Sequence, residues 1–199
     1  MILHATYMDD EAIDLVCSNK TPLVPTFTFQ ANLADYGEAV GASKEYREIF
    51  RKEIEDNCEI LQKVHKSGVP LLCGTESGFS LTPYGEWHYR ELEVFANDIG
   101  MTNLETIVCA TKNGAMALQK EGEVGTLEKD MLADILVVDG DPLEDITVLG
   151  DKSKLEYIFL GGKEIDQTIQ PSQVNPVSGW RLSPYSNNIL TQEVSKEKI

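Results

Sequence analysis

Two apolar runs of this chain end in polar side chains that are capable of chemistry. In the first run, Met1–Thr6, His4 follows Leu3 directly, and the second run, Val69–Cys73, leads into Gly74-Thr75-Glu76-Ser77-Gly78. Both runs are typical of buried strands. In parallel βα architectures, functional side chains gather at the carboxyl ends of the strands. An imidazole and a carboxylate that meet there would suit a divalent metal and a water molecule that it activates.

Each motif taken alone also permits a structural explanation. A single histidine after a strand is commonly a structural residue whose hydrogen bonds are satisfied. A single glutamate in a glycine-rich turn is commonly a capping acid. Chemistry therefore depends on whether the fold brings His4 and Glu76 together.

The segments around these motifs alternate between strands and helices, which predicts an α/β fold. Asp9 and Asp10 can begin one helix, Ser43 can cap a longer one, and Thr102 with Glu105 forms a capping box. Apolar residues at helical spacing follow each of these starts. The predicted helices cover residues 10–19, 43–66, 86–99 and 102–118; the predicted strands or extended segments cover residues 1–6, 21–29 and 69–73.

Beyond residue 120 the pattern changes to short strands. Three of them are expected at Val124–Leu127, Ala133–Val138 and Tyr157–Leu160, separated by glycine-containing turns. Residues 120–165 are therefore predicted to form a small β-rich module. The polar segment 166–199 is expected to lie loosely against the body, anchored by Trp180 and Tyr185.

Composition excludes some partners. The chain has 199 residues, with 17 Lys and Arg against 33 Asp and Glu, so its net charge is −16. Such a charge argues against nucleic acid and anionic membranes as partners. The start of the chain lacks a basic region and a long apolar run, so no leader or membrane span is expected and the predicted location is cytoplasmic.

The four cysteines, Cys17, Cys58, Cys73 and Cys109, are scattered among apolar residues without a short ligand spacing. We interpret them as buried free thiols in a reducing compartment, in preference to a thiolate nucleophile or a zinc site.

Taken in order, these motifs resemble the amidohydrolase superfamily, and within it the imidazolonepropionase-like and Xaa-Pro-dipeptidase-like branch. His4-Ala5-Thr6 resembles the His-Gly-Thr segment after the sixth barrel strand of that family. Gly74-Thr75-Glu76-Ser77-Gly78 resembles its Gly-Thr-Asp-Ser-Gly after the eighth strand. The resemblance extends over residues 1–165 and includes an Ala-Thr helix at Ala110-Thr111 and two return strands of a small β-sandwich, at Val124–Glu128 and Ala133–Leu143.

The resemblance implies a (β/α)8 barrel with one or two divalent metal ions, usually zinc, that hydrolyses amide, peptide or cyclic amide bonds. Carried over by position, His4 would be the metal ligand after strand six. Glu76 would stand at the position of the catalytic, metal-binding aspartate. Ser77 and Gly78 would line the pocket of a small amide or dipeptide-like substrate, and His88 would reach that substrate.

The departures from the family pattern are equally informative. The chain has no His-x-His pair, because its only histidines are His4, His65 and His88, and Glu76 is one methylene longer than aspartate. His65 is expected near the surface, close to the end of a helix. Residues 1–119 supply only the strands that resemble six to eight, whereas a closed barrel needs roughly 250 residues.

The predicted fold class is therefore the C-terminal portion of a (β/α)8 TIM-type barrel, with about three βα units in 1–119. Part of a small β-sandwich follows in 120–165, and a polar tail in 166–199. The function expected is that of an amidohydrolase fragment that is inactive alone. Two alternatives remain open. The chain is a non-catalytic remnant or a subunit that completes a barrel with a separate N-terminal half or with its own copies, or it is a small-molecule binding module without hydrolysis.

Overall fold

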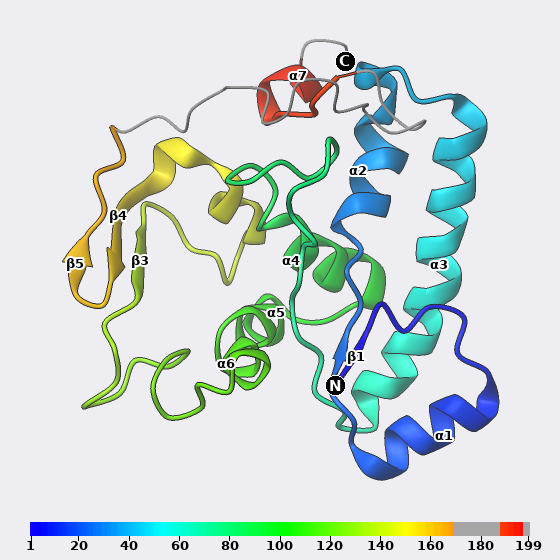
Figure 1. Ribbon diagram of the computed structural model, residues 1–199, viewed down its shortest axis with the longest axis horizontal. Coiled ribbons are helices and arrows are strands. Elements are labelled where there is room, and N and C mark those ends of the chain that lie inside the picture. The colour runs from blue at the N-terminus through cyan, green and yellow to red at the C-terminus, as the bar shows by residue number, and fades with distance from the viewer. Residues whose placement is uncertain (169–187, 197–199) are drawn as a thin grey trace.

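The computed structural model describes residues 1–168 and 188–196, and three parallel segments lie at its centre (Figure 1). Strand β1 (Ile2–Leu3) pairs with β2 (Leu23–Val24), and Leu23 also pairs in parallel with Leu71. The predicted α/β class is confirmed. The strands are shorter than predicted: β1 has two residues, and the segment 69–73 has one bridge, at Leu71.

Helices connect these parallel segments. Helix α1 (Asp10–Asn19) follows β1, and its N-cap Asp9 accepts a hydrogen bond from the Ala12 N–H at 2.9 Å. Helix α3 (Lys44–Lys66) precedes the Leu71 segment; Ser43 caps its start, and Gly68, at φ +83°, follows its end. Both helices were predicted, because their caps and apolar spacing are local signals.

Helix α2 (Thr28–Tyr36) was not predicted, and the expectation of an extended segment through residue 29 was wrong. The alternation of Phe27 and Phe29 resembles a strand. The backbone N–H groups of Phe27 and Thr28 instead donate to the carboxylate of Glu91, more than sixty residues away. A short 3-10 helix, η1 (Gly37–Val40), continues from α2. Both α2 and α3 lie on the right-hand side of Figure 1.

After the third parallel segment, a loop leads into α4 (Arg90–Val94), which continues as the π-helix η2 (Phe95–Ile99). The helix predicted from residue 86 begins four residues later, at Arg90, and the Glu86 carboxylate accepts hydrogen bonds from Lys152 and the Gln192 N–H. The Thr102–Glu105 capping box is confirmed at the start of α5 (Asn103–Ala110). The single predicted helix breaks at Thr111, and α6 (Lys112–Leu118) follows.

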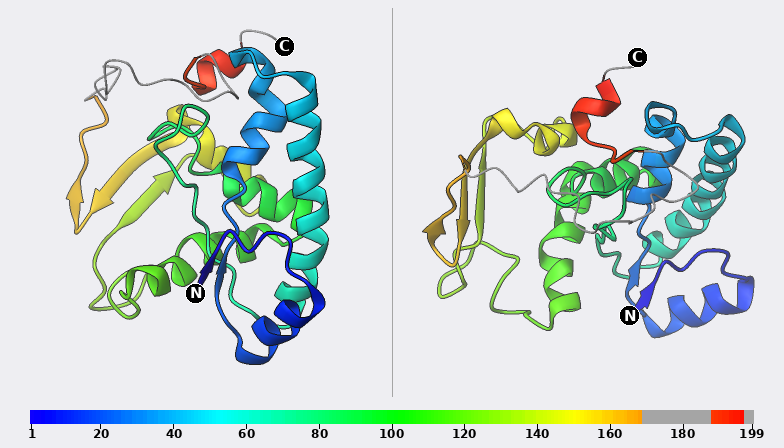
Figure 2. Two further views of the ribbon diagram at one scale, coloured as in Figure 1. Left: turned by 45° about the vertical axis from the view of Figure 1, so that its right-hand side comes forward. Right: turned by 45° about the horizontal axis from the view of Figure 1, so that its top comes forward.

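A small antiparallel sheet lies apart from the helices, as both views of Figure 2 show. It contains β3 (Ile135–Val138), β4 (Leu155–Leu160) and β5 (Lys163–Glu164), with the 3-10 helices η3 (Ile146–Gly150) and η4 (Lys152–Lys154) between β3 and β4. The predicted strand Val124–Leu127 was wrong. That segment forms bends, and its Leu127 side chain is 83% exposed, so it has no neighbouring strand to pair with in the described part of the chain.

The described C-terminal segment, residues 188–196, packs on the body of the molecule. It contains the short helix α7 (Gln192–Lys196), which lies close to α2 in Figure 1. Leu190 is fully buried in a cluster with Trp87 and Leu81. The predicted anchors Trp180 and Tyr185 lie outside the described residues, and the anchor that the structure shows is Leu190.

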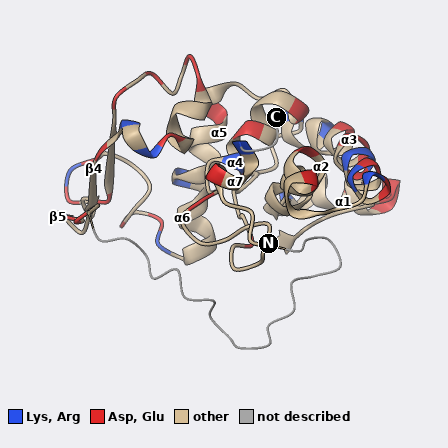
Figure 3. Ribbon diagram, turned by 90° about the horizontal axis from the view of Figure 1, so that it is seen from above, with Lys and Arg blue, Asp and Glu red and all other residues tan. Residues whose placement is uncertain are grey.

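Charged side chains are spread over the surface. Acidic and basic residues alternate along α3, and Figure 3 shows them interspersed there. No helix in the described residues is both long enough and apolar enough to span a membrane. All four cysteines are free; Cys58 and Cys109 are buried, and burial raises the pKa of each of these two thiols to about 12.

Candidate functional site

The structure brings the two predicted site residues together at the ends of the parallel segments. His4 follows β1, and Glu76 follows the segment that pairs at Leu71. The His4 Nε2 atom lies 3.9 Å from Glu76 Oε1, and their side chains are 47% and 44% exposed. The two groups therefore meet at the surface, where a substrate can reach them.

A third residue, Thr26, completes this set of strand ends. It follows β2 and is buried, with its hydroxyl 2.5 Å from the Nδ1 atom of His4. Sequence reasoning missed Thr26, although the rule applied to His4 and Glu76 points to it as well. It is the first polar side chain after the apolar Leu23–Val24 strand.

These three residues share an unusual backbone conformation. The φ angles of His4, Thr26 and Glu76 are 65°, 61° and 48°, in the left-handed region that favours glycine. Such a conformation costs on the order of 1–3 kcal/mol per residue, and such residues are concentrated at functional sites. All three strand ends therefore turn sharply where their side chains converge.

The glycine-rich turn around Glu76 fits closely against β2. A Cβ atom on Gly74 would lie 2.5 Å from Val24 Cγ1, so only glycine permits this approach. Within the turn, Thr75 Oγ1 lies 2.8 Å from Ser77 Oγ and 3.4 Å from His88 Nδ1. Ser77 and His88 are thus linked through Thr75 beside the candidate site, and their proposed contact with substrate stays a prediction.

The His88 ring also contacts its own loop. Its Nε2 atom accepts a hydrogen bond from the Gly85 N–H at 3.2 Å. Partial burial lowers the pKa of His88, which favours the neutral ring. The third histidine, His65, lies near the end of α3. Its Nε2 atom is 3.3 Å from Glu105 Oε1, on α5.

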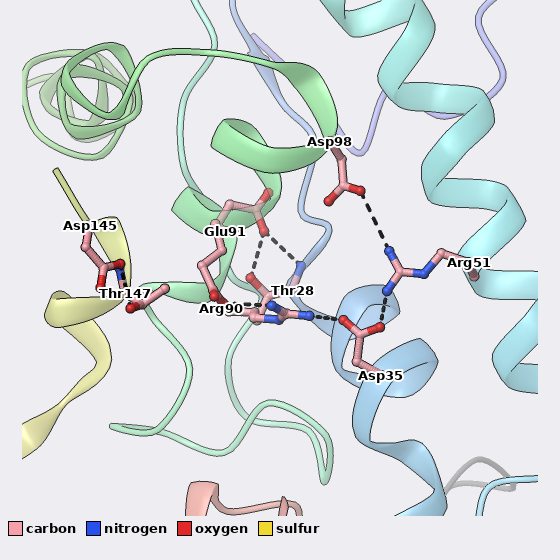
Figure 4. A network of polar contacts seen from close by, with 9 residues as sticks. Thr28, Asp35, Arg51, Arg90, Glu91, Asp98, Asp145 and Thr147 are labelled. Carbon is pink, nitrogen blue, oxygen red and sulfur yellow. Dashed lines mark hydrogen bonds and ion pairs between the residues drawn. The ribbon is translucent and has the colours of Figure 1, made fainter. Parts of the chain in front are cut away.

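A buried carboxyl group lies behind the site, on α4. Glu91 is fully buried, and its carboxylate accepts a hydrogen bond from Phe27 N at 2.9 Å. It also accepts hydrogen bonds from Thr28 N at 2.8 Å and Thr28 Oγ1 at 2.7 Å (Figure 4). Burial raises the pKa of Glu91 to about 7 despite these donors. The helical spacing of Glu91 with Val94 and Phe95 places a carboxyl group on an apolar face, which is the signal that sequence reasoning missed.

Charged residues next to Glu91 hold the surrounding helices together. Asp35 of α2 binds both Arg51 of α3 and Arg90 of α4, and Arg51 also lies 3.7 Å from Asp98 of η2 (Figure 4). The Arg90 side chain is only 10% exposed. Because the Asp35 carboxylate binds two guanidinium groups, it joins α2 to both α3 and α4. Helix α2 follows the loop after β2, so the network holds that loop at its far end.

His4 and Glu76 fit as two ligands of a divalent metal. Bonds from zinc to nitrogen and to carboxylate oxygen are about 2.0–2.2 Å long, so two of them can span the 3.9 Å between Nε2 and Oε1. In the described part of the chain, no group of three or more His, Cys, Asp or Glu side chains is placed to hold a metal. Within those residues, His4 and Glu76 would therefore be at most a partial set of ligands.

An α/β fold with acid and imidazole groups at the carboxyl ends of parallel segments matches the place where barrel enzymes have their active sites. Comparison with known families identifies the group within that class. The model of the amidohydrolase family matches residues 2–165, and the chain belongs to this family.

Among curated proteins, the chain is similar to ochratoxinase from Aspergillus niger. The two sequences are 28% identical over 162 residues, which are 80% of this chain and 32% of the ochratoxinase. The chain thus spans about a third of the length of the curated relatives it matches.

Solved structures give the same result. A Xaa-Pro dipeptidase with methionine bound in its active site has a TM-score of 0.67 and 26% identity, covering 82% of this chain and 39% of the dipeptidase. A prolidase complexed with N-methylphosphonate-L-proline has a TM-score of 0.63 and 26% identity, over 82% of this chain and 39% of its own. The Aspergillus niger ochratoxinase structure, at 23% identity and a TM-score of 0.67, covers 96% of this chain and 40% of its own and shows a shared fold.

Proposed function

We propose that this chain is the C-terminal part of a metal-dependent amidohydrolase that hydrolyses a C–N bond in a small amide, dipeptide or cyclic amide. One observation carries the proposal: His4 Nε2 and Glu76 Oε1 meet 3.9 Å apart at the ends of parallel segments. Family membership supports hydrolysis as the reaction class. Similarity to a Xaa-Pro dipeptidase and to ochratoxinase supports a small substrate.

In this proposal, His4 Nε2 and a carboxylate oxygen of Glu76 hold the divalent metal, with zinc as the expected ion. When bound there, the metal would supply Lewis-acid activation of the scissile carbonyl and of water. The other carboxylate oxygen of Glu76 accepts a proton from the attacking water and passes it to the leaving nitrogen as the C–N bond breaks, which regenerates the carboxylate. The Ser77 hydroxyl and the His88 ring bind the substrate.

We further infer that the catalytic barrel is completed by residues outside this chain, in a longer polypeptide or a separate subunit. The described residues supply two metal ligands at this site rather than a full set. Ile2 and Leu3 of β1 are 42% and 58% exposed, and a groove runs along β1 and the facing side of α1. A further βα unit placed there would pair with the free edge of β1 and cover these apolar side chains.

Zinc titration combined with a hydrolysis assay tests this function. The 199-residue chain alone is expected to bind zinc weakly and to hydrolyse neither Xaa-Pro dipeptides nor N-acyl amino acids. When the completing N-terminal half is present, Glu76→Gln is expected to lower kcat by about 10²–10⁴-fold, the usual contribution of a general acid–base. Lys129→Gln, a change at a fully exposed position far along the chain, serves as the matched control.

Three outcomes would overturn parts of the proposal. Tight, stoichiometric zinc binding and turnover by this chain alone would refute its incompleteness. Unchanged kcat for Glu76→Gln in the completed enzyme would refute the acid–base role. Substrate binding that chelators leave intact, without hydrolysis, would favour a binding module. The coding sequence upstream of Met1 distinguishes a longer polypeptide from a separate subunit. An in-frame His-x-His segment there would mean that one polypeptide supplies the completing half.

A further inference from the structure

The hydroxyl group of Thr26 contacts two polar atoms at hydrogen-bond distance. Its Oγ1 atom lies 2.6 Å from the carbonyl oxygen of Pro25 and 2.5 Å from the Nδ1 atom of His4. A hydroxyl group has one proton, and a carbonyl oxygen can only accept. If the proton pointed to Nδ1, the Thr26 and Pro25 oxygens would face each other with lone pairs alone.

Both contacts are hydrogen bonds only in one arrangement. The Thr26 hydroxyl donates to the Pro25 carbonyl and accepts from the Nδ1–H of His4. A neutral imidazole carries one proton, so its second nitrogen then has a free lone pair. That nitrogen is Nε2, the atom that lies 3.9 Å from Glu76 Oε1.

We propose that Thr26 is a positioning residue that fixes His4 in the Nδ1–H tautomer and directs the Nε2 lone pair toward the Glu76 carboxylate. Two electron-pair donors that face each other in this way can bind a cation between them. The role of Thr26 in catalysis rests on the proposed function, because it assumes that His4 is a metal ligand. Partners that orient a metal-binding histidine through its other nitrogen are a general feature of such sites.

The surrounding fold holds Thr26 in place for this role. Its φ of 61° is rare for a β-branched residue and would relax without support. Hydrogen bonds support the backbone before and after Thr26. Before it, the Val24 carbonyl accepts from the backbone N–H of His4 at 2.8 Å. After it, the backbone N–H groups of Phe27 and Thr28 donate to the buried Glu91 carboxylate. Glu91 therefore acts on His4 through the backbone that carries Thr26.

The matched variants of Thr26 separate its hydroxyl from its shape. Thr26→Val keeps the β-branched shape and removes the hydroxyl, whereas Thr26→Ser keeps the hydroxyl. Thr106→Val is the control, because Thr106 is buried as well and its hydroxyl donates to the Asn103 carbonyl, on α5. All are made in the full chain, and circular dichroism checks that each variant folds.

Nitrogen-15 NMR of the histidine rings, without metal and at a pH where they are neutral, reads the tautomer directly. The His4 signals are assigned by their loss in His4→Gln. The unmodified chain and Thr26→Ser are expected to carry the proton on Nδ1. In Thr26→Val the ratio of Nδ1–H to Nε2–H is expected to fall by roughly tenfold, the size of one lost hydrogen bond, while Thr106→Val leaves it unchanged.

An Nε2–H tautomer in the unmodified chain, or an unchanged ratio in Thr26→Val, would overturn the inference. If Thr26→Val unfolds, the inference is tested by the tautomer of His4 in the unmodified chain and in Thr26→Ser. The proposed function fails separately, if His4 and Glu76 variants of the completed enzyme keep full activity. Failure of the one is therefore distinguishable from failure of the other.

Discussion

Single residues at this site combine exposure for chemistry with burial for support. His4 and Glu76 are half exposed, whereas Thr26 and Glu91 behind them are buried. The buried groups are polar, so each needs hydrogen-bond partners to offset its desolvation. Glu91 has three donors, yet burial still raises its pKa to about 7, from an ordinary value of 4.5. The pKa of this buried carboxyl group therefore lies in the physiological range.

This pKa predicts a pH-dependent stability. Folded Glu91 holds its proton to a higher pH than the unfolded chain does, so its contribution to stability falls as pH rises from about 4.5 to about 7. The free energy of unfolding of the unmodified chain, minus that of Glu91→Gln, is expected to fall across this window by up to about 1.4 kcal/mol per pH unit.

Urea unfolding of both proteins at pH 5, 6, 7 and 8 measures this difference. Glu91→Gln is expected to be less stable at every pH, because its amide N–H₂ faces the Phe27 and Thr28 donors. The prediction concerns only how the difference in unfolding free energy changes with pH. A difference that stays constant, or that grows as pH rises from 5 to 7, would contradict it.

At the scale of elements, the C-terminal segment holds the loop that follows the candidate site. The Leu190 N–H donates to the Ser80 carbonyl at 2.7 Å, and Trp87 Nε1 donates to the Leu190 carbonyl at 2.8 Å. Gln192 Nε2 donates to the Glu86 carbonyl at 2.6 Å. Residues 77–89 connect Glu76 to α4 and include Ser77 and His88, so residues 188–196 bind the loop that carries both predicted substrate contacts.

Leu190→Ala tests this connection. Truncating a fully buried leucine is expected to cost about 2–5 kcal/mol of unfolding free energy and to speed amide hydrogen exchange over residues 79–89 more than in α1. Leu104→Ala, at a leucine that is 58% exposed, is the control and should change stability by at most about 0.5 kcal/mol. Equal losses for the two variants, or unchanged exchange over 79–89, would show that the segment does not hold the loop.

At the scale of the whole molecule, apolar surface remains open on one side. In the described residues β1 pairs on one edge only, with β2, and Ile2, Leu3 and Leu15 are between 42% and 58% exposed beside it. Leu136 and Leu160 of the small sheet are exposed as well. Single exposed apolar residues are ordinary, but a free strand edge beside them favours association. In the absence of a completing half, a second copy of the chain can cover this edge.

Size-exclusion chromatography measures that association. The unmodified chain is expected to elute above its monomer mass of 22.1 kDa, and Leu3→Lys is expected to shift it toward the monomer. The net charge of −16 opposes association, so the run needs about 0.15 M salt, at which charges are screened beyond roughly 8 Å. Leu104→Lys, at an exposed leucine of α5, is the control. A monomer for the unmodified chain would refute the self-association.

The sequence by itself determined the features that depend on neighbouring residues. Asp9, Ser43 and the Thr102–Glu105 box predicted three helix starts, because caps bond within three residues. Strand-end position was enough to select His4 and Glu76. These signals are local, and resemblance to the family rests on the same short motifs.

Only the tertiary structure decided what distant segments do together. Helix α2 begins at Thr28 because Glu91, on another helix, satisfies its first N–H groups. Leu127 forms no strand because the described residues place no partner strand beside it. Leu190 anchors the C-terminal segment because it is buried and its carbonyl accepts a hydrogen bond from Trp87 Nε1. The Thr26 hydroxyl meets His4 only once two strands are paired. Contacts between residues far apart in the chain leave no periodic pattern in the sequence, so folding is needed to reveal them.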